Sequence, residues 1–401
     1  MTNWHIVTCE YPPQIGGVSD YTGLLARELS NAGDDAHVWS PAFDSNEKEK
    51  QPNVHRSLGQ FLSADLKRTN ELLTQHASPR SLLVQWVPHA YGKRGINLGF
   101  CRWIASRVRG GDELYLMVHE PYLEPSQPTL KLRAISFLQR RMIRTLLYSA
   151  RRVFISIPAW ENYLRPYALP TMRFEWLPIP ATIGATHDPR AVPSIRARFG
   201  ENALVLGHLG TYSDEFCGIL RPALLKILAD HPLVHALLLG SNSDRFAREL
   251  NSQWPDLESR IHGTGVLSNR ALSHRLAACD LALQPYPDGL SSRRTSLMNL
   301  ISHGVPVVSN TGHLTESLWS DFNAVALATT TDASQLATMC SQLLIDVNGR
   351  RRLAQAGRTL YESKFDWPNH MAKLRNGAED DRNSVVAGTS SNQADKGVTL
   401  K

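Results

Sequence analysis

The chain has 401 residues, which is long for a single hydrophobic core and favours two domains. Hydrophobic residues make up 42% of it and charged residues 20%, values that exclude a fibrous or largely disordered protein. The formal net charge of +6 suits a partner that carries phosphates or an anionic membrane surface, and it also suits an ordinary basic protein without such a partner.

The five cysteines are odd in number and widely scattered along the chain. The sequence contains no Cys-x-x-Cys pair and no Cys/His spacing typical of zinc sites, so we expect neither a disulfide framework nor a metal site. The first residues lack a basic region followed by an apolar stretch, and no window has the length of a membrane span. These features predict a cytoplasmic protein.

In the first half, short apolar runs alternate with segments of helical period. A buried strand is predicted at residues 6–9, and a Pro- and Gly-rich loop and an amphipathic helix over 20–32 follow it. Further strands are predicted at residues 36–39, 81–86, 114–118 and 153–157. Buried strands separated by helices are typical of a parallel α/β sheet.

A Pro-rich stretch over residues 176–193 interrupts this alternation and is the best candidate for a domain boundary. The alternation then restarts, with strands predicted at 203–207, 234–239, 281–284 and 305–309. We therefore expect two Rossmann-like domains, 1–178 and 179–375, and a disordered polar tail over 376–401. Such tandem domains favour a ligand in the cleft between them.

The first loop with a chemical signal, residues 10–21, contains Gly16 and Gly17 between a strand and a helix. Glycines there let the backbone approach a ligand closely, and the start of a helix favours an anion. The alternative is a tight strand-to-helix turn with no ligand. The chain has no Gly-x-Gly-x-x-Gly and no Gly-x-x-x-x-Gly-Lys-Ser/Thr motif, so a nicotinamide cofactor and a P-loop are disfavoured.

His119 follows the predicted strand at 114–118, where an imidazole can hydrogen-bond to a hydroxyl or a phosphate. The alternative is a structural histidine in a turn. In the second half, Gly210 and Thr211 lie in a loop after a strand, and Val266 and Leu267 lie in a glycine-bounded turn before a helix.

The densest signal is the loop over 285–299, which leads into a helix and then into a buried strand. It presents Arg293, Arg294 and Thr295 at the predicted start of the helix. Two guanidinium groups beside backbone amides would form a cradle for a diphosphate. The alternative is an exposed pair of arginines, but two adjacent arginines in a loop are costly to place without an anion.

The order and spacing of these pieces resemble the large group of retaining glycosyltransferases called family 4, over roughly residues 5–375. The resemblance implies the two-domain GT-B fold. It also implies that Gly16 and Gly17 lie near the donor diphosphate and the acceptor, and that His119 faces the donor sugar. It places Gly210 and Thr211 in the first loop of the donor-binding domain, and it implies that the backbone at Val266 and Leu267 holds the nucleobase.

The resemblance fails at two glutamates that the family separates by seven residues. Their positions fall on Ser291, which would lie beside the sugar, and on Asn299, which would contact the ribose. The family's basic residues after Thr211 are also missing, so we hypothesise that Arg293 and Arg294 supply the positive charge. The loss of both carboxylates leaves the choice of donor and the stereochemistry open.

We therefore expect a glycosyltransferase that moves a sugar from a nucleoside-diphosphate donor to a glycan, lipid-linked or small-molecule acceptor, with no cofactor, metal or nucleic acid. The resemblance implies that the anomeric configuration is retained. The alternatives are a non-catalytic GT-B protein that binds nucleotide or glycan in a polysaccharide pathway, and a GT-B nucleotide-sugar epimerase. The stretch from Lys131 to Arg152 has seven basic residues and no acidic one, interleaved with apolar residues. It would be a core-packed helix with a basic outer face, or a peripheral contact with anionic lipid.

Overall fold

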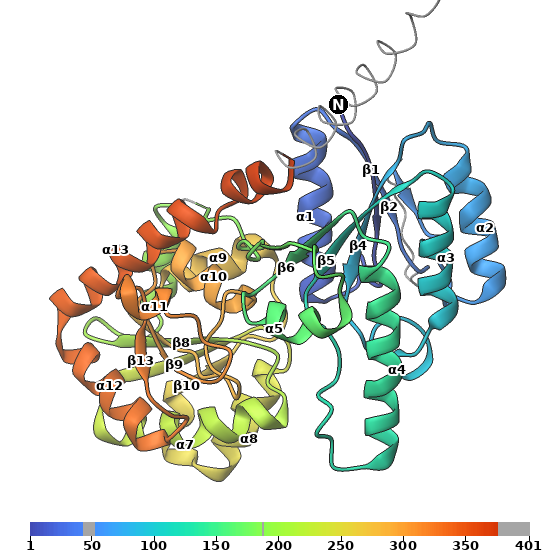
Figure 1. The fold of residues 1–401 in the computed structure, drawn as a ribbon. Coiled ribbons are helices and arrows are strands. Elements are labelled where there is room, and N and C mark those ends of the chain that lie inside the picture. The colour runs from blue at the N-terminus through green and yellow to red at the C-terminus, as the bar shows by residue number, and fades with distance from the viewer. Residues whose placement is uncertain (43–52, 187, 376–401) are drawn as a thin grey trace, which may run out of the picture.

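The computed structural model describes residues 1–42, 53–186 and 188–375. These residues form two α/β lobes, each built on one sheet (Figure 1). Every strand pairing in both sheets is parallel. The predicted α/β class with two Rossmann-like sheets is therefore confirmed, whereas the predicted tail over 376–401 lies outside the described residues.

The first sheet has the strand order β3-β2-β1-β4-β5-β6-β7. Its strands are β1 (Asn3–Val7), β2 (Asp35–Trp39), β3 (Val54–His55), β4 (Ser81–Trp86), β5 (Glu113–Val118), β6 (Arg152–Ile155) and β7 (Phe174–Trp176). Its helices are α1 (Gly17–Asn31), α2 (Ser63–Thr74), α3 (Leu98–Arg109), α4 (Leu130–Leu147) and α5 (Trp160–Leu164), with 3₁₀ turns at Lys93–Gly95 and Arg165–Tyr167.

The second sheet has the order β10-β9-β8-β11-β12-β13. Its strands are β8 (Leu204–Leu209), β9 (Val234–Leu239), β10 (Ile261–Gly263), β11 (Leu281–Leu283), β12 (Val307–Asn310) and β13 (Ala326–Ala328). Its helices are α6 (Ala191–Arg196), α7 (Asp214–Asp230), α8 (Ser243–Gln253), α9 (Asn269–Ala277), α10 (Thr295–Ser302), α11 (Leu318–Asp321), α12 (Ala333–Ile345) and α13 (Val347–Lys364), with a 3₁₀ turn at Pro255–Arg260.

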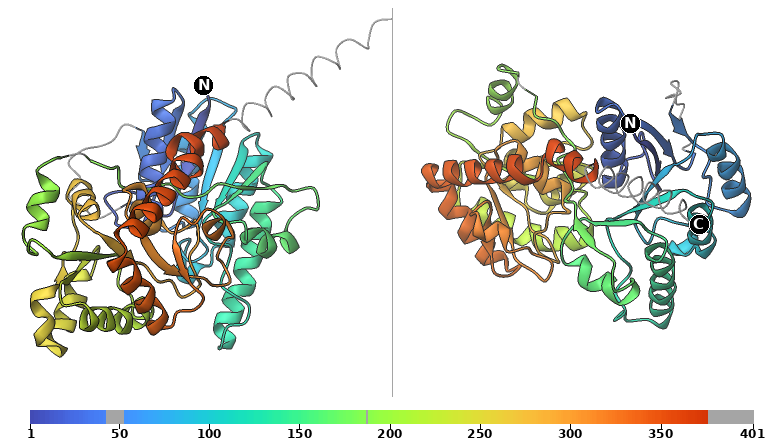
Figure 2. Two further views of the ribbon diagram at one scale, coloured as in Figure 1. Left: turned by 90° about the vertical axis from the view of Figure 1, so that its left-hand side faces the viewer. Right: turned by 45° about the horizontal axis from the view of Figure 1, so that its top comes forward.

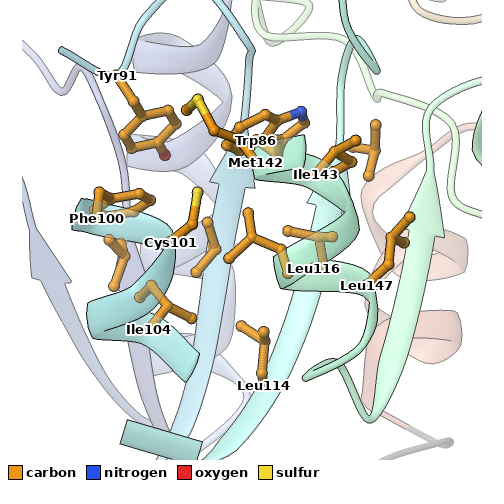
Figure 3. Packing of buried hydrophobic residues seen from close by; sticks show 14 of the residues in the cluster. Trp86, Tyr91, Phe100, Cys101, Ile104, Leu114, Leu116, Met142, Ile143 and Leu147 are labelled. Carbon is orange, nitrogen blue, oxygen red and sulfur yellow. The ribbon is translucent and has the colours of Figure 1, made fainter. Parts of the chain in front are cut away.

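The core of the first lobe lies between its sheet and the helices α3 and α4 (Figure 3). Phe100 and Ile104 from α3 and Met142 from α4 are fully buried against side chains of β4 and β5. Both faces of β4 are covered, because all six of its residues are buried. This explains why its sequence is largely apolar and does not alternate between apolar and polar residues.

The chain returns to the first lobe after α13, where residues 367–375 are helical (Figure 2). Trp367, Met371 and Leu374 pack against the cluster formed by β1, β2 and α1. The Tyr21 hydroxyl lies 2.9 Å from Nε2 of His370, and Nδ1 of His370 donates to the carbonyl of Pro178 at 3.0 Å. This returning segment therefore fastens the two lobes together, and the predicted boundary at 178/179 takes no account of it.

The basic stretch from Lys131 to Arg152 forms α4 and the start of β6. One face of α4 is buried, as a core-packed amphipathic helix requires, while Leu130 and Phe137 are exposed. Arg152 pairs with Glu175 and therefore does not face outward. Lipid contact through this stretch stays a prediction. Within the described residues, none of the helices combines the length and apolarity needed to span a bilayer.

Candidate functional site

A cavity of about 700 Å³ lies between the two lobes. Its walls come from the loops after β1, β4 and β5 in the first sheet and from those after β8, β9 and β11 in the second. The starts of α1 and α10 complete it, and Figure 1 shows α1 on the side of the first lobe that faces the second. The cavity thus lies where open parallel sheets commonly bind ligands, at the carboxyl ends of their strands.

All but one of the site residues predicted from the sequence line this single cavity. They are Gly16, Gly17, His119, Gly210, Thr211, Val266, Leu267, Arg293, Arg294, Thr295 and Asn299. The exception is Ser291, which is fully buried beside the cavity and whose Oγ has no hydrogen-bond partner among the described residues. Its position beside a donor sugar stays a prediction.

At the glycine loop, α1 begins at Gly17, three residues before the predicted start at residue 20. The carboxylate of Glu10 accepts a hydrogen bond of 2.9 Å from the backbone amide of Ser19. A Cβ atom on Gly16 would collide with this carboxylate, while one on Gly17 would meet no atom within 4 Å. Gly16 therefore makes room for Glu10, and Gly17 faces open space in the cavity.

His119 directly follows β5, and its Nε2 lies 2.7 Å from Oε1 of Gln85. Its carbonyl oxygen accepts hydrogen bonds from Ser156 and Trp160, which fix the backbone here. Burial, with a smaller contribution from His370, lowers the pKa of His119 to about 3. The imidazole is therefore neutral at physiological pH and acts at the cavity as a hydrogen-bonding group rather than as a cation.

His208 also lines the cavity, and the sequence analysis did not single it out. Its Nδ1 donates to the carbonyl of Leu283 at 2.8 Å, which leaves a lone pair on Nε2. Burial lowers its pKa to about 4, so this imidazole is neutral as well. Its place near the end of β8, two residues before Gly210, was the available signal.

Arg293 and Arg294 already have carboxylate partners within the chain. Arg293 donates to Asp288 and, across the cleft, to Glu120 at 2.8 Å, and Arg294 also pairs with Asp288. Although burial alone would raise the pKa of Asp288, the Arg294 and Arg293 guanidinium groups lower it overall. The sequence argument that these arginines require an external anion is therefore wrong: Asp288 and Glu120 supply the negative charge.

Asn299 lies in the middle of α10, and its side chain hydrogen-bonds to a loop of this chain. Its Oδ1 accepts from the backbone amides of Thr182 and Ile183 at 2.9 and 3.0 Å. Its Nδ2 donates to Oγ1 of Thr182 at 3.3 Å. One amide hydrogen of Asn299 remains available for a ligand.

The lining carries more negative than positive formal charge. Arg293 and Arg294 are its two cationic residues, against the carboxylates of Glu10, Asp20 and Glu120. Burial, followed by the charge of Glu10, raises the pKa of Asp20. Any anionic ligand must therefore displace carboxylates from the guanidinium groups, or bind mainly to backbone amides.

The buried histidines predict a loss of stability in acid. His119, His208 and His370 have pKa values lowered by burial from 6.5 to about 3, 4 and 3. The unfolded chain binds their protons below pH 6.5 while the folded protein does not. As the pH falls from 6.5 to about 4, we expect each of these histidines to lower the free energy of unfolding by about 1.4 kcal/mol for every pH unit.

Urea unfolding between pH 4.5 and 7.5 measures this slope. His370→Gln removes one of the three groups, so its slope should be shallower by about 1.4 kcal/mol per pH unit than that of the wild type. An unchanged slope would show that His370 does not hold its neutral form in the fold.

Solved structures of other proteins identify this fold. No protein-family model matches the sequence, and neither does any curated protein. Among solved structures, sucrose-phosphate synthase from Thermosynechococcus elongatus is similar with a TM-score of 0.75 and 16% identity, over 96% of this chain and 100% of that one. HepE from Anabaena in complex with UDP-glucose has a TM-score of 0.67 and 16% identity, over 94% and 99% of the two chains.

WaaG, a glycosyltransferase involved in lipopolysaccharide biosynthesis, is similar with a TM-score of 0.65 and 14% identity, over 92% of this chain and 99% of that one. At identities this low, the structural similarity establishes the fold alone. The chain has the two-domain GT-B architecture of these glycosyltransferases, as the sequence analysis expects.

Proposed function

We propose that the protein is a glycosyltransferase that takes a sugar from a nucleoside-diphosphate donor bound in the cleft between its lobes. The observation that carries the proposal is the convergence of eleven separately predicted residues on one cavity at the carboxyl ends of both sheets. The GT-B fold, shared with a protein that was solved with UDP-glucose, supports the class of ligand.

In this proposal the donor diphosphate lies between the starts of α1 and α10. Arg293 and Arg294 turn from Asp288 and Glu120 toward the leaving phosphates, whose charge increases as the glycosidic bond breaks. Backbone amides at Gly17 and Thr295 add oriented dipoles at the same point. Electrostatic stabilisation of the leaving group then supplies most of the rate enhancement, and a paired-carboxylate geometry is not needed.

The remaining contacts are assigned by position in the cavity. The backbone at Val266 and Leu267 holds the base, and the free amide hydrogen of Asn299 reaches the ribose. His119 and His208 are neutral, and each uses its ring N–H within the protein, so each accepts a hydrogen bond from a sugar hydroxyl with its other ring nitrogen. We further propose that the anomeric configuration is retained and that the acceptor enters from the first lobe, near Gly16.

A thermal-shift screen with UDP, GDP, ADP and their sugars tests donor binding. A ligand that binds only the folded protein raises the melting temperature. At a concentration a hundredfold above its Kd, it adds about 2.7 kcal/mol to the free energy of unfolding. The proposal expects one base to stabilise the protein above the others, with UDP-glucose as the first probe. No shift with any nucleotide would contradict it.

Gly17→Ala should weaken ligand binding without lowering the stability of the fold. A Cβ at Gly17 meets no protein atom within 4 Å but projects into the cavity. We expect an unchanged or slightly higher melting temperature, because alanine favours helices, together with nucleotide-sugar binding that is weaker by about tenfold or more. Calorimetric titration measures the binding.

Gly218→Ala is the matched control for this variant. Gly218 lies within α7, its Cβ would also meet nothing within 4 Å, and it does not line the cavity. Its variant should bind the donor like the wild type. Equal binding by Gly17→Ala and Gly218→Ala would place the diphosphate elsewhere.

A further inference from the structure

Four histidines that are far apart in the sequence gather on one side of the first sheet, outside the cleft. His5 lies in β1, His37 in β2, His55 in β3 and His76 just beyond α2. The ring centroid of His37 lies 5.2 Å from that of His5, 5.3 Å from that of His55 and 4.2 Å from that of His76. None of these residues belongs to the cavity lining, so the proposed glycosyl transfer gives them no role.

Three of these rings bring nitrogen atoms close to one another. His37, His55 and His76 each offer one ring nitrogen, and these atoms all lie within 4.8 Å of one another. Nδ1 of His37 and Nε2 of His55 are 3.1 Å apart. Two nitrogen ligands of a tetrahedral zinc ion, each at about 2.0–2.1 Å, stand roughly 3.3 Å apart, so this pair already has the required spacing.

The other nitrogen of His37 has a carboxylate partner. Nε2 of His37 lies 3.3 Å from Oδ2 of Asp35, two residues earlier in β2. A proton held on Nε2 by this carboxylate leaves the lone pair on Nδ1, the atom that faces His55. Carboxylates commonly orient metal-binding histidines in this way.

The fourth histidine, His5, packs beside the other three but is not one of the proposed ligands. Nδ1 of His5 accepts a hydrogen bond of 3.0 Å from the indole of Trp39, so the ring proton of neutral His5 is on Nε2. His5 is fully buried, and this Nε2 has no hydrogen-bond partner among the described residues. His37 is also buried, whereas His55 and His76 are partly exposed and leave a way in for an ion and a water molecule.

We propose that His37, His55 and His76 bind one divalent transition-metal ion of the zinc class, with Asp35 orienting His37 and water in the fourth position. Imidazole nitrogens suit zinc, nickel and copper, and tetrahedral zinc is the usual ion of a structural site. The ion would tie the edge strand β3 and the end of α2 to β2. This site departs from the sequence expectation of no metal, which considered only local spacing.

Equilibrium dialysis of the full chain against Zn²⁺, together with the visible spectrum of the Co²⁺-loaded protein, tests the proposal. We expect one tightly bound ion and the intense absorption of tetrahedral Co²⁺, which Zn²⁺ then displaces. His76→Ala should abolish this spectrum. His76 is partly exposed and lies beyond the end of α2, so this variant should fold.

His262→Ala is the matched control. His235 and His262 also lie with ring nitrogens 3.2 Å apart, but the described residues provide no third ligand there. The control should bind Co²⁺ like the wild type. Asp35→Asn keeps all three imidazoles and should weaken binding by about 10–100-fold.

Several results would overturn the proposal. One is a wild-type protein that binds no Zn²⁺ in dialysis or gives only the weak spectrum of octahedral Co²⁺. Another is His76→Ala or Asp35→Asn binding as tightly as the wild type. If His76→Ala failed to fold, the wild-type spectrum and Asp35→Asn would still decide the question.

Discussion

Replacing Arg293 and Arg294 together with alanine is expected to remove nucleotide-sugar binding almost completely. They are the two cationic residues of the cavity lining, so no other side chain there can replace their charge. A hydrogen bond to a charged group contributes about 1.5–3 kcal/mol, so losing one from each arginine should weaken binding by about 10²–10⁴-fold. Calorimetric titration with the nucleotide identified by the thermal-shift screen measures this loss.

Two other variants show whether the lost charge is the cause. Asp288→Asn keeps both arginines and removes the carboxylate that holds them, so donor binding should be equal to or tighter than that of the wild type. Arg248→Ala removes an exposed arginine of α8 outside the cavity and should change nothing. Wild-type affinity in the double alanine variant would contradict the assigned diphosphate position.

Gly240→Ala is expected to be the most destabilising single methyl addition at the site. Gly240 links β9 to α8 with a φ of 102°, which L-residues rarely adopt. A Cβ there would lie far inside contact distance of the carbonyl oxygen of Gly210, so two backbone segments would have to separate. Strain and overpacking together should cost about 2–5 kcal/mol in the free energy of unfolding.

Gly111→Ala separates these two costs. Gly111 has nearly the same φ, 100°, but a Cβ there meets nothing within 4 Å. This variant should lose only the cost of backbone strain, about 1–2 kcal/mol. Urea denaturation measures both variants, and equal losses would show that the contact between Gly240 and Gly210 does not constrain the fold.

The strands that the sequence predicted are the central ones. Four strands were missed, β3, β7, β10 and β13, and these are the four edge strands of the two sheets. Their residues are mostly half-buried, because an edge strand has a neighbour on one side only. Central strands such as β4 and β9 have largely apolar sequences and were predicted at their observed bounds, 81–86 and 234–239.

The order of loops along the chain also predicted which residues would share the cavity, since each follows a strand at its carboxyl end. The partners of those residues were not predictable. Arg293 meets Glu120 only because the two lobes are joined in space, and Asn299 meets Thr182 because the loop that enters the second lobe packs against α10. Such contacts depend on packing between segments more than a hundred residues apart and leave no local pattern.

The same limit applies to the returning C-terminal segment. Nothing in the sequence of this segment indicates that Leu374 would be buried in the first lobe. The histidine group of His37, His55 and His76 likewise forms through strand pairing and the course of α2, not through any motif.

Release of nucleoside diphosphate from the bound sugar donor, measured with and without fractions of soluble and lipid-linked glycan acceptors, tests the central claim most directly. The proposal predicts release that depends on the acceptor, with one glycoside formed for each diphosphate, and no release by the double alanine variant of Arg293 and Arg294. A donor that binds in the cleft but stays intact with every acceptor fraction would contradict catalysis and identify a nucleotide-binding GT-B protein without transferase activity.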